Sequence, residues 1–148
     1  MKESTLHKIM SQAWKSSEHS ECKRKKVGAV LVDRLTYKIV SSGYGGATIE
    51  CYTCIRDLEE WKQDGCWSVH AELRALLGLC EKLNIPPSGL GSMDLIMFTT
   101  HGPCDQCLKY MDLFGIRTCV YDIPYHNNWE KWTGRVQVFS LKEAYELL

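Results

Sequence analysis

Four residues in two short stretches have the types and spacing of a metal site. His70 and Glu72 lie two positions apart in "VHAEL", and Cys104 and Cys107 lie three apart in "HGPCDQC". Imidazole nitrogen and thiolate sulfur suit zinc, and three protein ligands leave a fourth position for water, as in catalytic zinc sites. We expect the Glu72 carboxylate near this site but on another side of its helix, where it can take a proton from that water and pass it on.

Two other interpretations of the cysteine pair are a thioredoxin-like redox pair and a structural zinc. The redox interpretation accounts for neither His70 nor Glu72. A structural zinc would require a fourth side chain. Both stretches are expected to begin helices, and helix N-termini present unpaired N–H groups that favour anions, thiolates included. The sequence therefore predicts a catalytic zinc held by His70, Cys104 and Cys107, with Glu72 as the catalytic acid and base.

A second set of cysteines has the makings of a structural zinc site. Its members are Cys22, Cys51, Cys54 and Cys66. A tetrathiolate zinc would join the irregular segment 44–69 to the end of the first helix. His19 can replace one cysteine in this scheme, and free buried thiols are the alternative. Cys80 and Cys119 lie within apolar patterns and are expected in the core.

The elements that position these residues alternate between helix and strand. An amphipathic stripe that begins at Leu6 and ends at Trp14 predicts the first helix, and residues 27–33 and 37–45 predict a β-hairpin. A second stripe, formed by Leu73, Leu76, Leu77 and Cys80, predicts a helix from His70 onward. Residues 84–92 are expected to be loop. Further strands are predicted at 93–100, 118–122 and 136–140, and further helices at 104–114 and after Ser140, which forms a capping box with Glu143.

Composition narrows the class of protein. The chain has 148 residues, with 18 basic and 18 acidic side chains. Its size predicts one domain, residues 1–148, and alternating strands and helices predict an α/β fold. The balanced charge provides no global attraction to nucleic acid or an anionic membrane. The N-terminus resembles no signal peptide and no apolar run is long enough to span a membrane, so a cytoplasmic protein is expected, in the host cytoplasm if it is viral.

Taken together, the two halves of the motif resemble the cytidine deaminase-like superfamily, whose signature is H-x-E followed by P-C-x-x-C. The stretches "ECKRKKVGAVLVD", "SSGYGG", "HAELRAL", "TTHGPC" and "FGIRTCVYD" are most similar to the deoxycytidylate deaminases. The resemblance implies a three-layer α/β/α sandwich around a mixed five-stranded sheet, homo-oligomers, and in several members a second, structural zinc. It also implies zinc-dependent hydrolysis of dCMP to dUMP and ammonia, with the Ala71 N–H holding the ring carbonyl and the Gly102 carbonyl accepting from the amine.

The phosphate and sugar end of the substrate is defined by fewer features. Arg24 and Lys26 belong to the basic run 23–26 and are expected to neutralise a 5′-phosphate, with a solvated turn as the alternative. Tyr44 and Tyr125 are candidates to line the sugar and base pocket, or to be half-buried packing residues. His101 is a further candidate for substrate contact, or a satisfied neighbour of the site.

Two positions depart from the pattern that the resemblance implies for substrate recognition. Gly45 and Arg74 each stand where deoxycytidylate deaminases typically have asparagine. Gly45 offers no side chain to hydrogen-bond, whereas Arg74 can hold a phosphate or be a solvated helix residue. The alternatives are therefore a deaminase of another free base or nucleoside, or of bases in RNA or single-stranded DNA, which would need a basic channel lined by aromatic residues. A non-catalytic zinc domain is disfavoured because Glu72 is intact.

Overall fold

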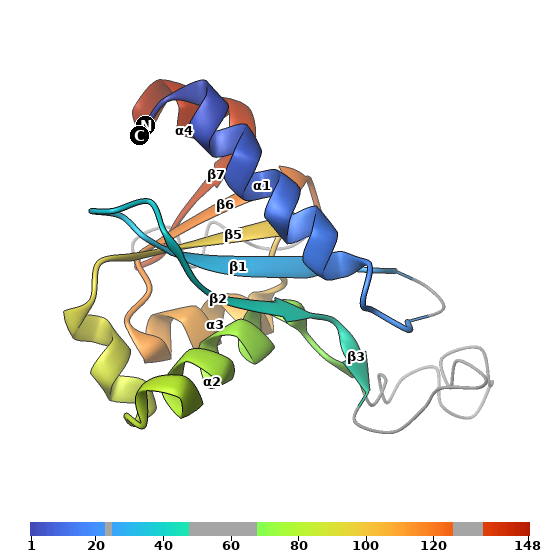
Figure 1. The fold of residues 1–148 in the computed structure, drawn as a ribbon, viewed down its shortest axis with the longest axis vertical. Coiled ribbons are helices and arrows are strands. Elements are labelled where there is room, and N and C mark those ends of the chain that lie inside the picture. The colour runs from blue at the N-terminus through green and yellow to red at the C-terminus, as the bar shows by residue number, and fades with distance from the viewer. Residues whose placement is uncertain (23–24, 48–67, 126–134) are drawn as a thin grey trace.

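The computed structural model describes residues 1–22, 25–47, 68–125 and 135–148. Its main feature is a five-stranded sheet of order β2-β1-β5-β6-β7 (Figure 1). The strands are β1 (Gly28–Asp33), β2 (Ile39–Tyr44), β5 (Leu95–His101), β6 (Thr118–Ile123) and β7 (Gln137–Ser140). β1 pairs antiparallel with both β2 and β5, whereas β5, β6 and β7 run parallel. The sheet is therefore mixed, as the sequence predicts.

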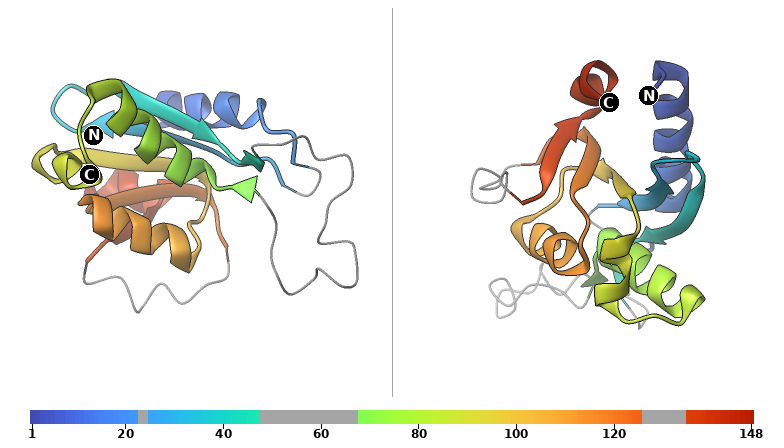
Figure 2. Two further views of the ribbon diagram at one scale, coloured as in Figure 1. Left: turned by 90° about the horizontal axis from the view of Figure 1, so that it is seen from below. Right: turned by 90° about the vertical axis from the view of Figure 1, so that its left-hand side faces the viewer.

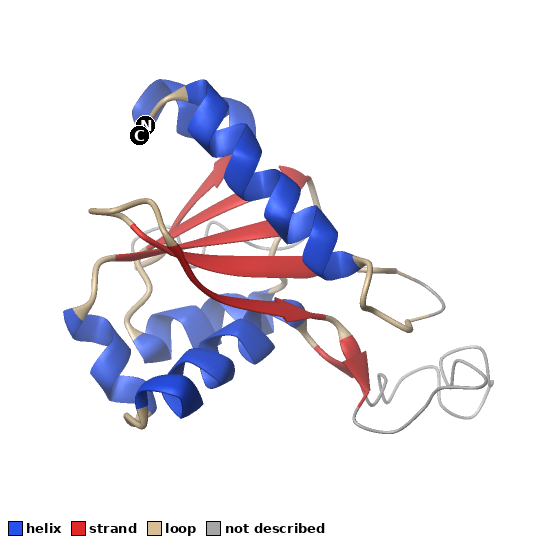
Figure 3. Cartoon of the chain, in the orientation of Figure 1, coloured by secondary structure: helices blue, strands red, loops and turns tan. Residues whose placement is uncertain are grey.

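Helices cover both faces of this sheet. The helices α1 (Glu3–Ser17) and α4 (Leu141–Leu147) lie on one face, and α2 (Ala71–Leu83) and α3 (Asp105–Phe114) lie on the other (Figures 2 and 3). Each face has its own buried apolar cluster, because the alternating side chains of β1 and β5 point to opposite sides. Val30 and Phe98 pack with α1, whereas Leu31 and Met97 pack with α2 and α3. The three-layer α/β/α sandwich is confirmed.

Two smaller elements complete the described fold. A two-stranded ribbon of β3 (Gly46–Ala47) and β4 (Ser68–Val69) leads directly into α2. A 3-10 helix, η3 (Pro87–Ser92), follows α2. The prediction that residues 84–92 form loop is thus wrong in part, since Pro86 and Pro87 suit the start of a helix whose first N–H groups need no intrahelical partner.

The stripe predicted for α2 is also partly wrong. Leu77 is 47% exposed, and the buried side of the helix includes Ala71, Ala75 and Leu79. On the opposite strand, Gly43 lies so close to α2 that a Cβ atom there would be 2.3 Å from the Ala71 carbonyl oxygen and 2.6 Å from the Ala75 backbone N. This close approach leaves room for the small Ala71 and Ala75 at the two positions next to Gly43.

Other predictions of local structure hold. Cys80 and Cys119 are buried, and Leu6, Ile9, Met10 and Ala13 are the buried stripe of α1. Ser140 and Glu143 form the predicted capping box of α4. Among the described residues, no helix combines the length and apolar character needed to span a membrane.

Candidate metal centre and active site

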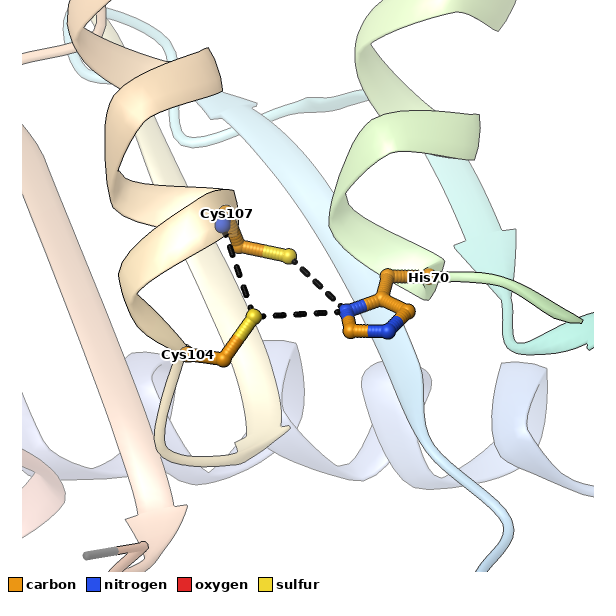
Figure 4. Close-up of side chains that lie close together, drawn as sticks. All are labelled: His70, Cys104 and Cys107. Carbon is orange, nitrogen blue, oxygen red and sulfur yellow. Dashed lines mark hydrogen bonds between the residues drawn. The ribbon is translucent and has the colours of Figure 1, made fainter. Parts of the chain in front are cut away.

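His70, Cys104 and Cys107 come together at the N-terminal ends of α2 and α3 (Figure 4). The His70 Nδ1 atom lies 3.2 Å from Cys107 Sγ and 3.4 Å from Cys104 Sγ. The ligand atoms of all three residues lie within 4.8 Å of one another. The side chains range from exposed His70 to buried Cys107, so the cluster is open to solvent on one side. Solvent or a substrate can reach the cluster from the His70 side.

Local structure explains why these residues meet. His70 is the N-cap of α2 and Cys104 is the N-cap of α3, which begins just after β5 ends. The Cys104 side chain accepts a hydrogen bond from the backbone N–H of Cys107, so it both caps the helix and faces its partner thiol. Residues i and i+3 lie on the same side of a helix, which directs both sulfurs to one point. The ends of two helices thereby create one site.

The pKa values of the two thiols are shifted in opposite directions. The pKa of Cys104 is lowered to about 4, first because Cys107 hydrogen-bonds to it and, against the cost of burial, because His70 adds a further hydrogen bond. The pKa of Cys107 is raised, first by its hydrogen bond to Cys104 and then by burial and the Glu72 carboxylate. These opposite shifts favour the thiolate form at Cys104 and the protonated form at Cys107. A metal that binds both sulfurs has to displace that proton.

Glu72 lies beside the cluster rather than within it. Its side chain is 4% exposed, with Oε2 at 3.2 Å from Cys107 Sγ and Oε1 at 2.9 Å from Thr99 Oγ1. A buried carboxylate needs such partners, because an unpaired charge is costly in a low-dielectric interior. This location agrees with the sequence expectation that Glu72 lies near the metal site.

The donor set of the cluster fits zinc. One imidazole nitrogen and two thiol sulfurs are the ligand types that zinc takes, and three of them leave a coordination position open. Cys104 and Cys107 are free thiols, so neither is lost to a disulfide. These three residues can hold a zinc ion.

Two of the candidate substrate residues, Ala71 and Gly102, adjoin the cluster residues His70 and Cys104 along the chain. Ala71 is the first residue of α2, where N–H groups lack an intrahelical partner. The buried Gly102 donates its N–H to the Ile123 carbonyl at 2.7 Å, which fixes the backbone between β5 and the cysteines. Lys26 is exposed, and Tyr125 is 45% exposed with the Lys25 Nζ atom 4.8 Å from its ring centre.

Arg74 in α2 contacts Tyr44 at the end of β2. The Arg74 Nη2 atom donates to the Gly46 carbonyl at 2.8 Å, and its guanidinium lies 5.1 Å from the centre of the Tyr44 ring. Arg74, which stands where an asparagine is expected, thus connects α2 to the β3–β4 ribbon. The neighbouring Gly45 takes part through its backbone, since its N–H donates to Val27 and its carbonyl accepts from Ser20.

The predicted second metal set is only partly within the described residues. Arg24 and three of the four cysteines, Cys51, Cys54 and Cys66, lie outside them. Cys22 is described: it is half-buried, and its backbone N–H donates to Ser20 Oγ at 3.3 Å.

Two structural features near the site are missing from the sequence interpretation. The first is the hydrogen bond from Thr99 to Glu72. The only sign of it in the sequence is weak: Thr99 is a polar residue near the end of a strand that is otherwise mostly apolar. The second is an aromatic contact, in which Trp14 packs edge-on against His101 at 5.5 Å between ring centres and donates Nε1–H to Asp122. Burial, the main cause, and the charge of Lys25 lower the pKa of His101, whereas Asp122 opposes that shift.

Comparison with known proteins places the chain in a family. Residues 3–123 match the family model described as the cytidine and deoxycytidylate deaminase zinc-binding region. The chain therefore belongs to the cytidine and deoxycytidylate deaminase family. The predicted enzyme class, a zinc-dependent hydrolase of the deaminase type, is the class of that family.

Individual relatives agree with this assignment. A deoxycytidylate deaminase of Mycobacterium phage D29 is 31% identical over 119 residues, covering 72% of this chain and 84% of the relative. The ComE operon protein 2 of Bacillus subtilis is also 31% identical over 119 residues, covering 79% of this chain but 58% of the relative's length. The apo crystal structure of dCMP deaminase from cyanophage S-TIM5 superposes with a TM-score of 0.71 at 26% identity, covering 95% of this chain and 99% of that one. The same cyanophage enzyme in complex with dCMP and dUMP gives 0.68 at 28% identity, covering 95% and 98%.

Proposed function

We propose that this chain catalyses the hydrolytic deamination of dCMP to dUMP and ammonia. His70, Cys104 and Cys107 are the proposed zinc ligands, and Glu72 is the proposed catalytic acid and base. The observation that carries the proposal is the buried Glu72 carboxylate, which points Oε2 to within 3.2 Å of a sulfur in the metal cluster. Two phage relatives that are named as deaminases of this nucleotide, one of them crystallised with dCMP and dUMP, support the choice of substrate.

When bound, zinc makes water a strong nucleophile near neutral pH. Glu72 would take one proton from the attacking water as its oxygen bonds to carbon 4 of the cytosine ring, and would deliver that proton to ring nitrogen 3. Glu72 would then carry the second proton to the amino group. The carbon–nitrogen bond would break, ammonia would leave, and a carbonyl group would remain at carbon 4. Burial keeps bulk water away from this carboxylate and strengthens its interactions with the reacting groups.

Backbone groups near Glu72 are proposed to orient the cytosine ring of the substrate. The Ala71 N–H lies at the positive end of α2, where it can donate to the ring carbonyl. The Gly102 carbonyl is proposed to accept from the exocyclic amine, because it precedes Pro103 and Cys104 in a segment fixed by the bond to Ile123. Both roles are carried by main-chain atoms and so do not depend on side-chain identity.

The phosphate end of the substrate is proposed to bind the basic run that contains Arg24 and Lys26. Tyr44 and Tyr125 are proposed to line the sugar and base pocket. Arg74 is the weaker candidate for a phosphate ligand, because its guanidinium already donates to Gly46 and lies over Tyr44. Loss of Lys26 should therefore raise KM for dCMP more than KM for deoxycytidine.

The deciding experiment measures ammonia release and product mass with dCMP, dCTP, deoxycytidine, cytosine, guanine and short oligonucleotides. We expect dCMP to be converted fastest. Glu72→Ala should retain zinc and fold while losing turnover, and Cys80→Ala, which alters a buried cysteine of α2 away from the cluster, is the matched control. Preferential conversion of an oligonucleotide would favour a nucleic-acid deaminase, and full activity of Glu72→Ala would reject the mechanism.

Further predictions concern the whole protein. We propose that residues 1–148 form one domain, that the chain assembles as a homo-oligomer, and that it acts in the cytoplasm, or the host cytoplasm if it is viral. The five cysteines that the structure describes are all free thiols, which suits a reducing compartment. A second, structural zinc at Cys22, Cys51, Cys54 and Cys66 is also proposed. Two zinc ions per purified chain would support it, whereas a single zinc that is lost on replacement of Cys104 would not.

A further inference from the structure

Thr99 is a buried polar residue to which the proposed mechanism assigns no role. It lies near the end of β5, the middle strand of the sheet, and its side chain has no exposed surface. The residue pairs with Ala29 on one side and Tyr121 on the other, so its backbone is held from both directions. Threonine is also stiff about its first side-chain torsion. Its hydroxyl is consequently a rigidly placed group.

Two acceptors face that hydroxyl. Thr99 Oγ1 lies 2.9 Å from Glu72 Oε1 and 3.0 Å from the carbonyl oxygen of His101. A carbonyl and an ionised carboxylate cannot donate, so Thr99 must be the donor to whichever it bonds. The shorter of the two contacts, at 2.9 Å, is the one to the Glu72 carboxylate.

This contact makes the two oxygens of Glu72 different from each other. Oε1 is held by Thr99 at the sheet, whereas Oε2 points to Cys107 in the metal cluster. Without the bond to Thr99, the contact with Cys107 would be the remaining side-chain hydrogen bond to the carboxylate among the described residues. We propose that Thr99 is a positioning residue that fixes the Glu72 carboxylate and directs Oε2 to the reacting atoms. This inference rests on the proposed function of Glu72.

The experiment compares Thr99→Val, which removes the hydroxyl while preserving shape, with Thr99→Ser, which preserves the hydroxyl. Loss of the hydrogen bond to the Glu72 carboxylate should lower kcat by about 10-fold or more in Thr99→Val. KM for dCMP should change by less than about twofold, because Thr99 is not expected to touch the substrate, and zinc content should be unchanged. Thr99→Ser should restore most of kcat.

The matched control is Thr118→Val. Thr118 is also a buried sheet threonine with a side-chain hydrogen bond, which it accepts from Arg34 Nη2 at 2.7 Å, but it lies at the start of β6. Its loss should lower thermal stability without a selective effect on kcat. Equal kcat values for Thr99→Val and Thr118→Val, or a Thr99→Ser variant as slow as Thr99→Val, would overturn the proposal.

A readout without turnover separates this proposal from the function on which it rests. A wild-type protein inactive on every cytosine compound would reject the proposed function alone. High-resolution crystal structures of zinc-loaded wild type and Thr99→Val then decide the role of Thr99. We expect the Glu72 carboxylate to rotate or to occupy several orientations in the variant. An unchanged carboxylate would refute the positioning role.

Discussion

Gly43 is the position where one added methyl group should disturb the site from a distance. It lies in β2, directly opposite Ala29, on the face that α2 covers. A Cβ atom at this position would lie 2.3 Å from the Ala71 carbonyl oxygen and 2.6 Å from the Ala75 backbone N. Both neighbours are helix backbone, which cannot turn aside as a long side chain can. Gly43→Ala should therefore push the first turn of α2, with His70 and Glu72, away from the sheet.

The size of the effect follows from these distances. Real Cβ atoms essentially never approach within 3.0 Å, so a contact at 2.3 Å requires the helix or strand to move by at least 0.7 Å. Overpacking of this kind costs about 1–3 kcal/mol. For a chain of this length each kcal/mol corresponds to about 2–4 °C in Tm. A displacement near 1 Å in a catalytic group can lower the rate by about 10²-fold, so we expect a fall in kcat/KM of that order.

The assay combines differential scanning calorimetry, zinc content and kcat/KM for dCMP. Gly91→Ala is the control, because a Cβ at that position in η3 would meet its nearest neighbour at 3.8 Å and needs no movement. The control should keep the stability and activity of the wild type. A Gly43→Ala protein with unchanged Tm and unchanged kcat/KM would show that α2 is not seated on the strand as described. A loss of Tm with full kcat/KM would show that the site tolerates the shift.

Three other perturbations test separate parts of the molecule. Cys104→Ser should lose the catalytic zinc, measured by metal analysis, whereas Cys80→Ala should retain it. Arg74→Met should release zinc to a chelator faster than Arg74→Lys does. Arg74 donates to the carbonyl of Gly46, which belongs to the β3–β4 ribbon that leads into His70. Equal release rates in the two variants would contradict this explanation. Asp112 pairs with two arginines, and the hydrogen bond from Arg135, opposed by burial and assisted by that from Arg117, lowers its pKa. Asp112→Asn should therefore cost about 0.2–1 kcal/mol per pair at pH 7 in urea unfolding. This difference should begin to shrink as the pH falls below the ordinary carboxyl pKa of about 4 and should be lost once the pH passes below the lowered pKa of the folded state; a difference that persists at still lower pH would contradict the ion-pair explanation.

Much of the chemistry could be predicted from local spacing. Cys104 and Cys107 lie three apart at a helix start, and this alone directs both sulfurs to the same side. The capping box at Ser140 and the buried strand before the cysteines are also local patterns, in which each residue type satisfies its own backbone or burial requirement. Such patterns depend on neighbours in the chain, so the sequence alone is sufficient to reveal them.

Other features depend on what lies across space. The sequence contains only a weak indication that Thr99 contacts Glu72 and none that Arg74 donates to Gly46, because each pair joins elements far apart along the chain. Leu77 has the hydrophobicity of a core residue, yet it is 47% exposed, whereas the smaller Ala71 and Ala75 lie against Gly43 of β2. Local sequence patterns are thus sufficient to select the candidates for metal binding and proton transfer, because these roles require particular chemical groups. The orientation of those groups depends on the folded chain, since it arises from contacts between distant elements that no local pattern records.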